Sequence, residues 1–327
     1  MRKIKWGVLG TADIFAGQTS KGMMLAENCE RYAIAGRSLA KAEDFRERFG
    51  FEKAYGSYEE LLKDEAVEAV YIPLPNTLHY EWTIKALQHK KHVLCEKPLA
   101  PTEKTAAEMF AEAEKNGVYL MEAFAYQHSP YMAALEDEVQ RGAVGDVRYV
   151  ETAFLTSDYD MSNIRMRKET LGGATYDLGV YCTSFVLRVL GVEPKSVQAV
   201  CSKSPDGIDI FTNILLEYEN GIRADLSCGM VLATGQARRM DRFQIHGTKG
   251  TIKSQKFEYN KEGNMSYDVR SFDGVRAHRD LDVPQNYSLE IEQFGRCIAE
   301  GETPAVTKEF SLANARMIDR ILEAIKY

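Results

Sequence analysis

Residues 5–16 read KWGVLGTADIFA, an apolar run that ends in a glycine and continues as a helical pattern. Such a run is typical of a buried parallel strand that turns sharply into a helix. A dinucleotide fingerprint carries G-x-G-x-x-G/A at this kind of turn, where the backbone approaches a pyrophosphate. Gly10 matches the first glycine, whereas Ala12 replaces the second and Phe15 the third. The match is weak alone, but its place at the first turn of the chain favours a dinucleotide site, formed by Gly10, Thr11, Ala12, Asp13 and Ile14.

The rest of the N-terminal third continues to alternate short apolar runs with amphipathic stretches. Between these runs, Ser57 precedes Glu60 in a capping-box pattern, and Gly117 closes a helical stretch that opens at Thr102. Continuous apolar strands alternating with helices predict a doubly wound parallel sheet, an α/β (Rossmann) domain over residues 1–122. The predicted strands lie at 5–10, 32–36, 69–74, 92–95 and 118–121.

The rhythm changes after residue 123. A helical pattern at 131–141 and another after Gly172-Gly173 accompany several strand-like runs joined by tight turns. Successive strands with short connections form mostly antiparallel sheets. Residues 123–327 are therefore predicted to form an α+β domain on one broad, mostly antiparallel sheet, for substrate binding and dimerisation. Its predicted strands lie at 147–155, 197–201, 210–218, 222–226, 242–246 and 251–254, and its last helices at 289–299 and 312–325.

Composition excludes several classes of function. A net charge of −7 disfavours nucleic acid as the main partner, and no apolar run approaches the length of a membrane span. The six cysteines are scattered without a CxxC pair, and no signal-peptide cleavage site follows the N-terminal apolar run. These features predict reduced thiols in the cytoplasm. His89 and His92 straddle the end of a helix and the start of a strand, so we expect no metal site.

The end of the second predicted strand indicates which dinucleotide is bound. An acidic residue there would hold the ribose hydroxyl of NAD. This chain instead has Gly36, Arg37 and Ser38, with Lys41 one helical turn beyond. Because a guanidinium fork suits a phosphate, we predict NADP in preference to NAD. The alternative is that Arg37 and Lys41 are solvated surface charges.

Four motifs in order resemble the Gfo/Idh/MocA oxidoreductase family over nearly the whole chain. They are WGVLGTA at 6–12, PNTLH at 75–79, CEKP at 95–98 and DLGVY at 177–181. The stretches AYGSYEELLKD, HVLCEKPLAPT and YLMEAF look most like the branch that contains dimeric dihydrodiol dehydrogenase and NADP-dependent D-xylose dehydrogenases.

The resemblance implies a hydride transfer between NADP and a hydroxyl or carbonyl carbon of a sugar, a sugar derivative or a cyclic diol. In the family the lysine of Glu-Lys-Pro lies beside the nicotinamide, and its bond to proline is commonly cis; Lys97 matches it. Asp177 and Tyr181 match the second-domain residues, and their i, i+4 spacing would place both on one helix face. We assign proton transfer to Lys97 and Tyr181, in a cleft between the domains, with Asp177 holding substrate hydroxyls or tuning Lys97. Further predicted cofactor contacts are Leu74, Pro75, Asn76, His79, Glu96 and Pro98.

Substrate selectivity is harder to assign. Tyr126, Gln127 and His128 depart from the family's usual choices and are candidates, with core packing as the alternative. Arg165 is a candidate for an anionic or polyol substrate, with a loop charge as the alternative. Two other functions stay open: a dinucleotide-binding sensor without turnover, and a reductase of a non-sugar carbonyl or imine. The broad sheet predicts a homodimer, or a dimer of dimers.

Overall fold

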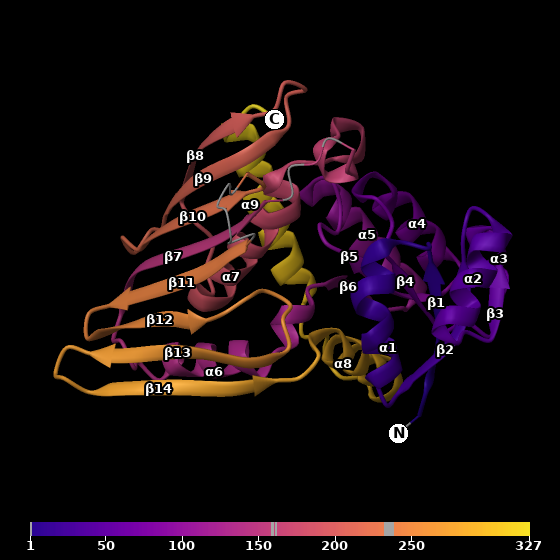
Figure 1. The fold of residues 1–327 in the computed structure, drawn as a ribbon, viewed down its shortest axis with the longest axis horizontal. Helices are drawn as coiled ribbons and strands as arrows, with labels where there is room; N and C mark the ends of the chain where they lie inside the picture. The colour runs from indigo at the N-terminus through magenta and orange to yellow at the C-terminus, as the bar shows by residue number, and fades with distance from the viewer. Residues whose placement is uncertain (1, 158–159, 161, 232–238) are drawn as a thin grey trace. The chain divides into compact units, whose positions relative to one another are not determined.

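The computed structural model describes residues 2–157, 160, 162–231 and 239–327. Its contacts divide the chain into two compact units (Figure 1). The first unit contains the residues up to His128 together with Pro284–Ser311, and the second contains Ser129–Val283 together with Leu312–Tyr327.

The first unit is built on a six-stranded sheet whose strands are all parallel. The strand order is β3-β2-β1-β4-β5-β6, so the order reverses between β1 and β4. This is the doubly wound topology that the alternating pattern predicts, and that prediction is confirmed. The strands are β1 Ile4–Leu9, β2 Cys29–Ala35, β3 Lys53–Tyr55, β4 Ala69–Ile72, β5 His92–Glu96 and β6 Leu120–Ala123.

The helices of the first unit begin and end where their caps allow. The Ser57 hydroxyl accepts a hydrogen bond from the Glu60 amide, and Thr102 and Thr105 form a reciprocal capping box. Gly117 ends its helix with a left-handed φ of 66°. The helices are α1 Ser20–Leu25, α2 Leu39–Phe49, α3 Tyr58–Lys63, α4 Asn76–Gln88, α5 Glu103–Asn116 and α8 Asn286–Glu300, with a π-helix η1 Phe15–Thr19 and a 3-10 helix η2 Ala125–His128.

This division differs from the predicted one, which ended the nucleotide-binding domain at residue 122 and gave all later residues to the other domain. Helix α8 instead packs on α1, β1 and β2 of the first unit. A side chain at Gly22 would come within 2.7 Å of Tyr287 Cβ, so the two helices touch closely. The Asn28 amide also donates to the carbonyl oxygen of Glu292 at 2.8 Å. The amphipathic pattern at 289–299 identifies a helix but carries no information on which sheet receives its apolar face.

The second unit contains an eight-stranded sheet in the order β14-β13-β12-β11-β7-β10-β9-β8. Among the described strand pairs of this sheet, only β7 and β10 are parallel, so the predicted broad, mostly antiparallel sheet is confirmed. Strands β13 and β14, at one edge, were not predicted. The strands are β7 Val147–Thr156, β8 Ser196–Lys203, β9 Asp209–Glu217, β10 Arg223–Gly229, β11 Arg239–Gly247, β12 Gly250–Lys256, β13 Gly263–Ser271 and β14 Arg276–Val283.

Helices α6 and α7 pack against one face of this sheet (Figure 1). Along β9 the residues at 212, 214 and 216 are buried while Asn213 and Leu215 are exposed, which is the alternation of a strand covered on one side. The helical elements are α6 Pro130–Gln140, α7 Val180–Leu190, the 3-10 turns η3 Ile164–Met166 and η4 Lys168–Thr170, a π-helix η5 Thr175–Gly179, and α9 Lys308–Ala324, which enters this unit at Leu312.

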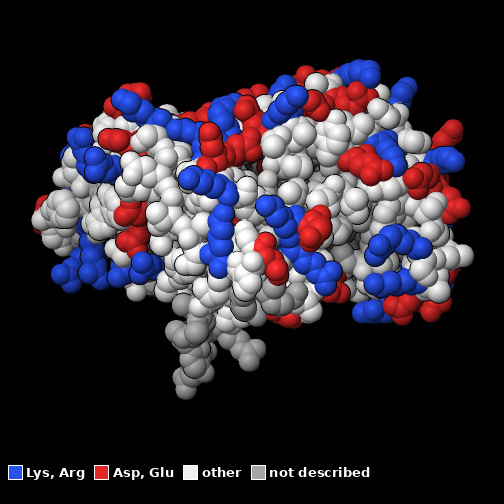
Figure 2. Space-filling view, turned by 90° about the horizontal axis from the view of Figure 1, so that it is seen from above, with Lys and Arg blue, Asp and Glu red and all other residues white. Residues whose placement is uncertain are grey.

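Positive and negative side chains are interspersed over the face that Figure 2 shows. None of the described helices has the length and apolar character to cross a membrane. His89 Nδ1 lies 2.9 Å from its own helix's Lys85 carbonyl oxygen, and His92 Nδ1 accepts from the Tyr119 amide.

Candidate active site

The turn after β1 requires a glycine at residue 10. Gly10 has a φ of +128°, and its amide donates to the carbonyl oxygen of Ala35 at 2.9 Å. A Cβ here would stand 3.0 Å from Leu74 Cδ2, in the loop after the neighbouring strand β4. The Ala12 carbonyl oxygen accepts the first helical hydrogen bond, from the Ala16 amide at 3.1 Å. The backbone at Gly10 therefore carries no side chain, at a strand end that leads directly into a helix. A pyrophosphate bound at such a turn needs this close access to the backbone.

Phe15 explains why the third fingerprint glycine is missing. Its side chain is fully buried, and the segment around it is the π-helix η1. A third glycine normally allows a helix to pack closely on the strand. Here the ring fills that space, in contact with the rings of Phe45, Phe49, Phe51 and Tyr71.

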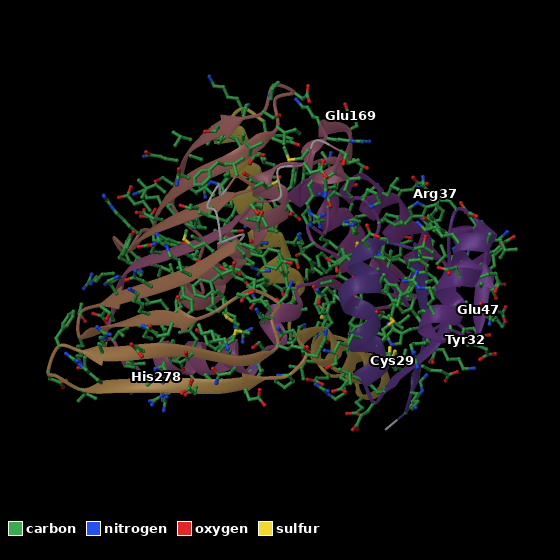
Figure 3. All side chains as sticks on the ribbon, in the orientation of Figure 1. Cys29, Tyr32, Arg37, Glu47, Glu169 and His278 are labelled. Atoms are coloured by element: carbon green, nitrogen blue, oxygen red, sulfur yellow. The ribbon has the colours of Figure 1, made fainter. Side chains whose placement is uncertain are left out.

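The end of β2 presents a positive, hydrogen-bonding surface. Arg37, Ser38 and Lys41 are exposed (Figure 3 labels Arg37). Ser38 immediately precedes α2, its hydroxyl makes no capping hydrogen bond, and the first turn of α2 has no acidic residue. Burial raises the pKa of Tyr58, and the charge of Arg37 partly offsets that rise. A phosphate group at this helix start would meet a cation, a hydroxyl and backbone amides.

His79 joins the loops after β4 and β5. Its ring is fully buried, with Nδ1 2.8 Å from the Pro98 carbonyl oxygen and Nε2 2.7 Å from the Leu74 carbonyl oxygen. Burial lowers the pKa of His79, the two carbonyl groups oppose that effect, and the charge of Lys97 adds to it. A neutral imidazole donates through only one nitrogen, so the hydrogen bonding of this link depends on the protonation of the ring. The buried ring of His79 therefore links the loop after β4 to the loop after β5. Pro75 and Asn76, also predicted contacts, begin α4 in the first of these loops.

Lys97 follows β5 directly and is partly exposed. The Lys97–Pro98 peptide bond is cis, as the family resemblance predicts. The preceding residue, Glu96, is buried and accepts a 2.5 Å hydrogen bond from the Tyr71 hydroxyl, which lies 2.9 Å from the hydroxyl of Thr19. Glu96 thus anchors the strand end to the π-helix η1, and only Lys97 of the two reaches the surface.

Glu122 is a buried charge near this turn that the sequence analysis did not single out. It lies on β6 opposite Cys95, and one carboxyl oxygen accepts from the Leu99 amide at 2.9 Å. The other oxygen is buried, and no described residue makes a hydrogen bond of ordinary geometry to it. Burial raises the pKa of Glu122 to about 7, against the opposing effects of the nearby Ser311 hydroxyl, the Leu99 amide and the charge of Lys97. A glutamate inside an apolar strand of a parallel sheet is the signal that could have identified it.

The three selectivity candidates Tyr126, Gln127 and His128 lie in η2 of the first unit. Tyr126 and Gln127 are buried, and the Gln127 amide donates to the Tyr126 hydroxyl at 2.6 Å. The side chain of His128 is also enclosed, 4.0 Å from the carboxyl group of Glu290. Their part in substrate selection stays a prediction.

Asp177, of the second unit, lies in the π-helix η5 and not in the regular α-helix that the i, i+4 spacing assumes. Helix α7 begins three residues later, at Val180, so Tyr181 and Asp177 flank the junction. The Arg165 guanidinium donates to the Asp177 carboxylate at 2.9 Å, with 43% of the arginine side chain and 18% of the aspartate side chain exposed. The structure thus pairs two residues that were predicted separately.

Asp209 anchors this π-helix and was also missed. One of its oxygens accepts from the Thr175 amide at 2.8 Å, the Thr175 hydroxyl at 2.7 Å and the Thr212 hydroxyl at 2.9 Å. The carboxyl group is fully buried at the start of η5. It therefore fixes the segment two residues before Asp177.

Taken unit by unit, the residues form two groups. The loops after β2, β1, β4 and β5, four adjacent strands, carry Arg37, Gly10, Leu74 and Lys97 at one edge of the parallel sheet. This is the edge where open α/β sheets bind ligands. The second group is Asp177 with Arg165, and Tyr181. An amine, a phenol and a carboxylate are groups that can move a proton and hold a hydroxyl group.

Comparison with known proteins adds the family. Residues 4–124 match the model of an oxidoreductase family with an NAD-binding Rossmann fold, and residues 132–253 match the GFO/IDH/MocA C-terminal domain. D-xylose 1-dehydrogenase (NADP(+)) 2 of Haloferax volcanii is 33% identical, covering 98% of this chain and 96% of its own. Trans-1,2-dihydrobenzene-1,2-diol dehydrogenase of Mus musculus is 30% identical, with 98% and 95% covered.

A solved 3-ketoreductase from Actinomadura kijaniata, in complex with NADP and TDP-benzene, superimposes with a TM-score of 0.90. It is 30% identical, and the match covers 99% of this chain and 98% of that one. Variants of that enzyme with one lysine or one tyrosine replaced have also been solved, and the two replaced residues are 84 positions apart. Lys97 and Tyr181 have the same separation here.

The raised pKa of Glu122 predicts a measurable pH dependence of stability. The folded protein keeps this proton at pH values where the unfolded chain has released it, so the free energy of unfolding falls as the pH rises from 4.5 to about 7. Glu122→Gln keeps the acceptor for the Leu99 amide and removes the titration. We expect the variant to gain about 2 kcal/mol relative to the parent between about pH 5 and about pH 8, measured by denaturant unfolding.

The same substitution at the exposed Glu65 is the control and should leave the pH dependence of unfolding as in the parent. A parent-like pH dependence in Glu122→Gln would contradict the prediction.

Proposed function

Because this chain belongs to the Gfo/Idh/MocA oxidoreductase family, we propose that it transfers a hydride between NADP and a hydroxyl or carbonyl carbon of a sugar, a sugar derivative or a cyclic diol. The observation that carries the proposal is the line of four adjacent strand ends, which brings Arg37, Gly10 and Lys97 to one edge of one sheet. A relative that acts on xylose, a relative that acts on a dihydrodiol and a ketoreductase solved with NADP support the substrate class.

NADP fits the residues of the first unit. The turn at Gly10 would receive the pyrophosphate, since any side chain there would meet Leu74. Arg37, Ser38 and Lys41 would hold the ribose phosphate at the start of α2. His79 would keep the loops of Leu74 and Lys97 in register. When bound, the dinucleotide supplies the hydride acceptor or donor.

Lys97, Tyr181 and Asp177 would handle the substrate oxygen. Oxidation of an alcohol requires that its hydroxyl proton be removed as hydride leaves the carbon. We assign that proton to Tyr181 and Lys97, with the lysine the more necessary of the two. Asp177, held by Arg165, would accept hydrogen bonds from neighbouring substrate hydroxyls. Arg165 would then shape the same subsite and favour polyols or anionic sugars over cations.

We also propose a homodimer formed through the face of the eight-stranded sheet that α6 and α7 leave open. Val200 and Leu215 are exposed on that face, beside the Tyr149–Asp225 hydrogen bond and the Arg242–Glu151 ion pair. A broad mixed surface of this kind is suited to pairing with its own copy across a two-fold axis.

The six free cysteines, five of them buried, support a reducing, cytoplasmic location.

The choice of cofactor can be tested at Arg37. We expect Arg37→Ala to raise KM for NADP about 10- to 100-fold, because a charge-assisted hydrogen bond to phosphate is lost, and to change KM for NAD little. Steady-state kinetics with each dinucleotide measure this. Arg48→Ala, which removes an exposed charge from the other end of α2, is the matched control. Equal losses with both dinucleotides, or a parent that prefers NAD, would count against the assignment.

The proton-transfer assignment can be tested by single substitutions. We expect Lys97→Ala and Tyr181→Phe to lower kcat about 100-fold or more, Lys97→Ala the more severely, with NADP affinity within a few-fold of the parent. Aldoses, dihydrodiols and inositols provide the substrate panel, followed by cofactor absorbance. Lys104→Ala, on the exposed start of α5, is the control.

Parent-like turnover in Lys97→Ala would refute the mechanism. Tight NADP binding with no turnover on the whole panel would favour a dinucleotide-binding sensor instead.

The dimer can be tested in solution. Sedimentation should give a mass twice the 36.9 kDa of one chain. We expect Leu215→Asp, which places a charge on the open face, to shift the protein toward the monomer because a buried unpaired charge is costly. Val192→Asp, in the exposed loop after α7, is the control. A monomeric parent would exclude the dimer.

A further inference from the structure

Tyr181 has a fixed ring. It lies near the start of α7, and only 7% of its surface is exposed. The ring packs against Phe154 on β7 and Tyr259 in the loop after β12, with centroid distances of 5.4 Å and 5.3 Å. Aromatic neighbours on two sides stop the ring from swinging. The ring packing leaves only the direction of the hydroxyl proton undetermined, and the hydrogen bonds of the hydroxyl group set that direction.

Asn260 determines part of that hydrogen bonding. Its side-chain Nδ2 donates to the Tyr181 Oη at 2.9 Å. Because an amide nitrogen only donates, the phenol oxygen accepts in this bond and directs its own proton to a different acceptor. A donor on the oxygen also stabilises the phenolate more than the phenol. The contact therefore both orients the hydroxyl group and favours release of its proton.

The turn that carries Asn260 is itself clamped. Asn260 has a left-handed φ of 58°, which asparagine tolerates better than most residues. The Tyr259 amide donates to the Asp241 carboxylate at 2.7 Å, and Arg239 donates to the Tyr259 carbonyl oxygen at 2.8 Å. Arg239 and Asp241 are joined by two hydrogen bonds of 2.8 Å and 2.6 Å. A bidentate ion pair on β11 thus holds both backbone groups of the residue before Asn260.

The charge of Arg239, like the hydrogen bond from Asn260, favours the phenolate form of Tyr181. Its guanidinium group lies 4.5 Å from the centroid of the Phe154 ring, which also contacts Tyr181. Burial alone would lower the pKa of Arg239, but Asp241, Glu258 and Tyr181 together raise it, so the charge is kept. A retained cation near the phenol favours its ionised form. The titratable and charged groups on the elements around the phenol include Arg239, Asp241, Glu258, Tyr259 and Lys261, Cys182 on α7, and Asp177 with its partner Arg165.

We infer that Asn260 is a positioning residue for proton transfer at Tyr181, and that the Arg239–Asp241 pair holds it in place. The inference rests on the proposed function, since Asn260 takes part in the reaction only through Tyr181.

The test compares Asn260→Asp with Asn260→Ala. Aspartate keeps the size of the side chain but only accepts, so the phenol must donate to it and retain its proton. We expect Asn260→Asp to lower kcat about 10- to 100-fold and to move the limb of the kcat–pH profile that reports proton loss toward higher pH. Asn260→Ala should lower kcat about 10-fold with KM for NADP unchanged. In the double variant Tyr181→Phe/Asn260→Asp, kcat should fall no further than in Tyr181→Phe alone.

Asn220→Asp is the matched control, since its side-chain oxygen accepts from the Ile222 amide and an aspartate can do the same. Circular dichroism and melting temperature confirm that each variant is folded. Multiplication of the two single effects in the double variant would overturn the inference, because Asn260 would then act independently of Tyr181. Parent-like turnover in Tyr181→Phe would overturn the role of Tyr181 and this inference with it. Lost turnover in Tyr181→Phe, with parent-like kcat and pH profile in both Asn260 variants, would overturn the inference alone.

Discussion

Parallel pairing of β2, β1, β4 and β5 is the constraint on which the first unit depends. All strands of a parallel sheet end at one edge, so loops that are far apart in the sequence become neighbours there. This closeness decides which residues can stand in the loops. Gly10 has no side chain because Leu74 occupies the space, and the buried ring of His79 links the carbonyl groups of Leu74 and Pro98. The Gly10 turn and the Lys97 turn are thus parts of one packed edge.

Three buried carboxyl groups near the candidate site residues cost stability, and their hydrogen-bond donors show which segments they hold in place. Glu96, Glu122 and Asp209 are almost wholly enclosed, where an ionised carboxylate is unfavourable. Each accepts hydrogen bonds from the segment it supports: Glu96 from Tyr71, Glu122 from Leu99 and Asp209 from Thr175. An apolar side chain would pack without the desolvation cost but could not hold a backbone amide or a hydroxyl group in place. Departures from the rule of an apolar core are expected at functional sites.

The parts of the fold that the sequence predicted are those with strong local patterns. Strands β1, β2, β4, β5 and β6 each contain a short apolar run, and the alternation of these runs with helices predicts the doubly wound sheet. The edge strand β14 was missed because five of the eight residues in RAHRDLDV are polar or charged. The destination of α8 was missed because an amphipathic helix does not identify its partner. Lys97 and Tyr181 were singled out through motifs, and their roles stay predictions. Glu122, Asp209 and Asn260 are single polar residues whose partners are distant in the sequence, so only the folded chain shows what they contact.

The two π-helices show a further limit of sequence periodicity. A π turn holds more residues than an α turn, so it changes the face on which every later side chain lies. Both occur where a helix follows a site segment: η1 after the glycine turn and η5 around Asp177. In η1 the wider turn accommodates Phe15 where a glycine would let the helix approach the sheet. In η5 it separates Asp177 from the regular spacing of α7, so the two side chains are held by different contacts: the Asp177 carboxylate by Arg165, and the Tyr181 ring by Phe154 and Tyr259. A helix of uniform period would have tied the two side chains to a single face.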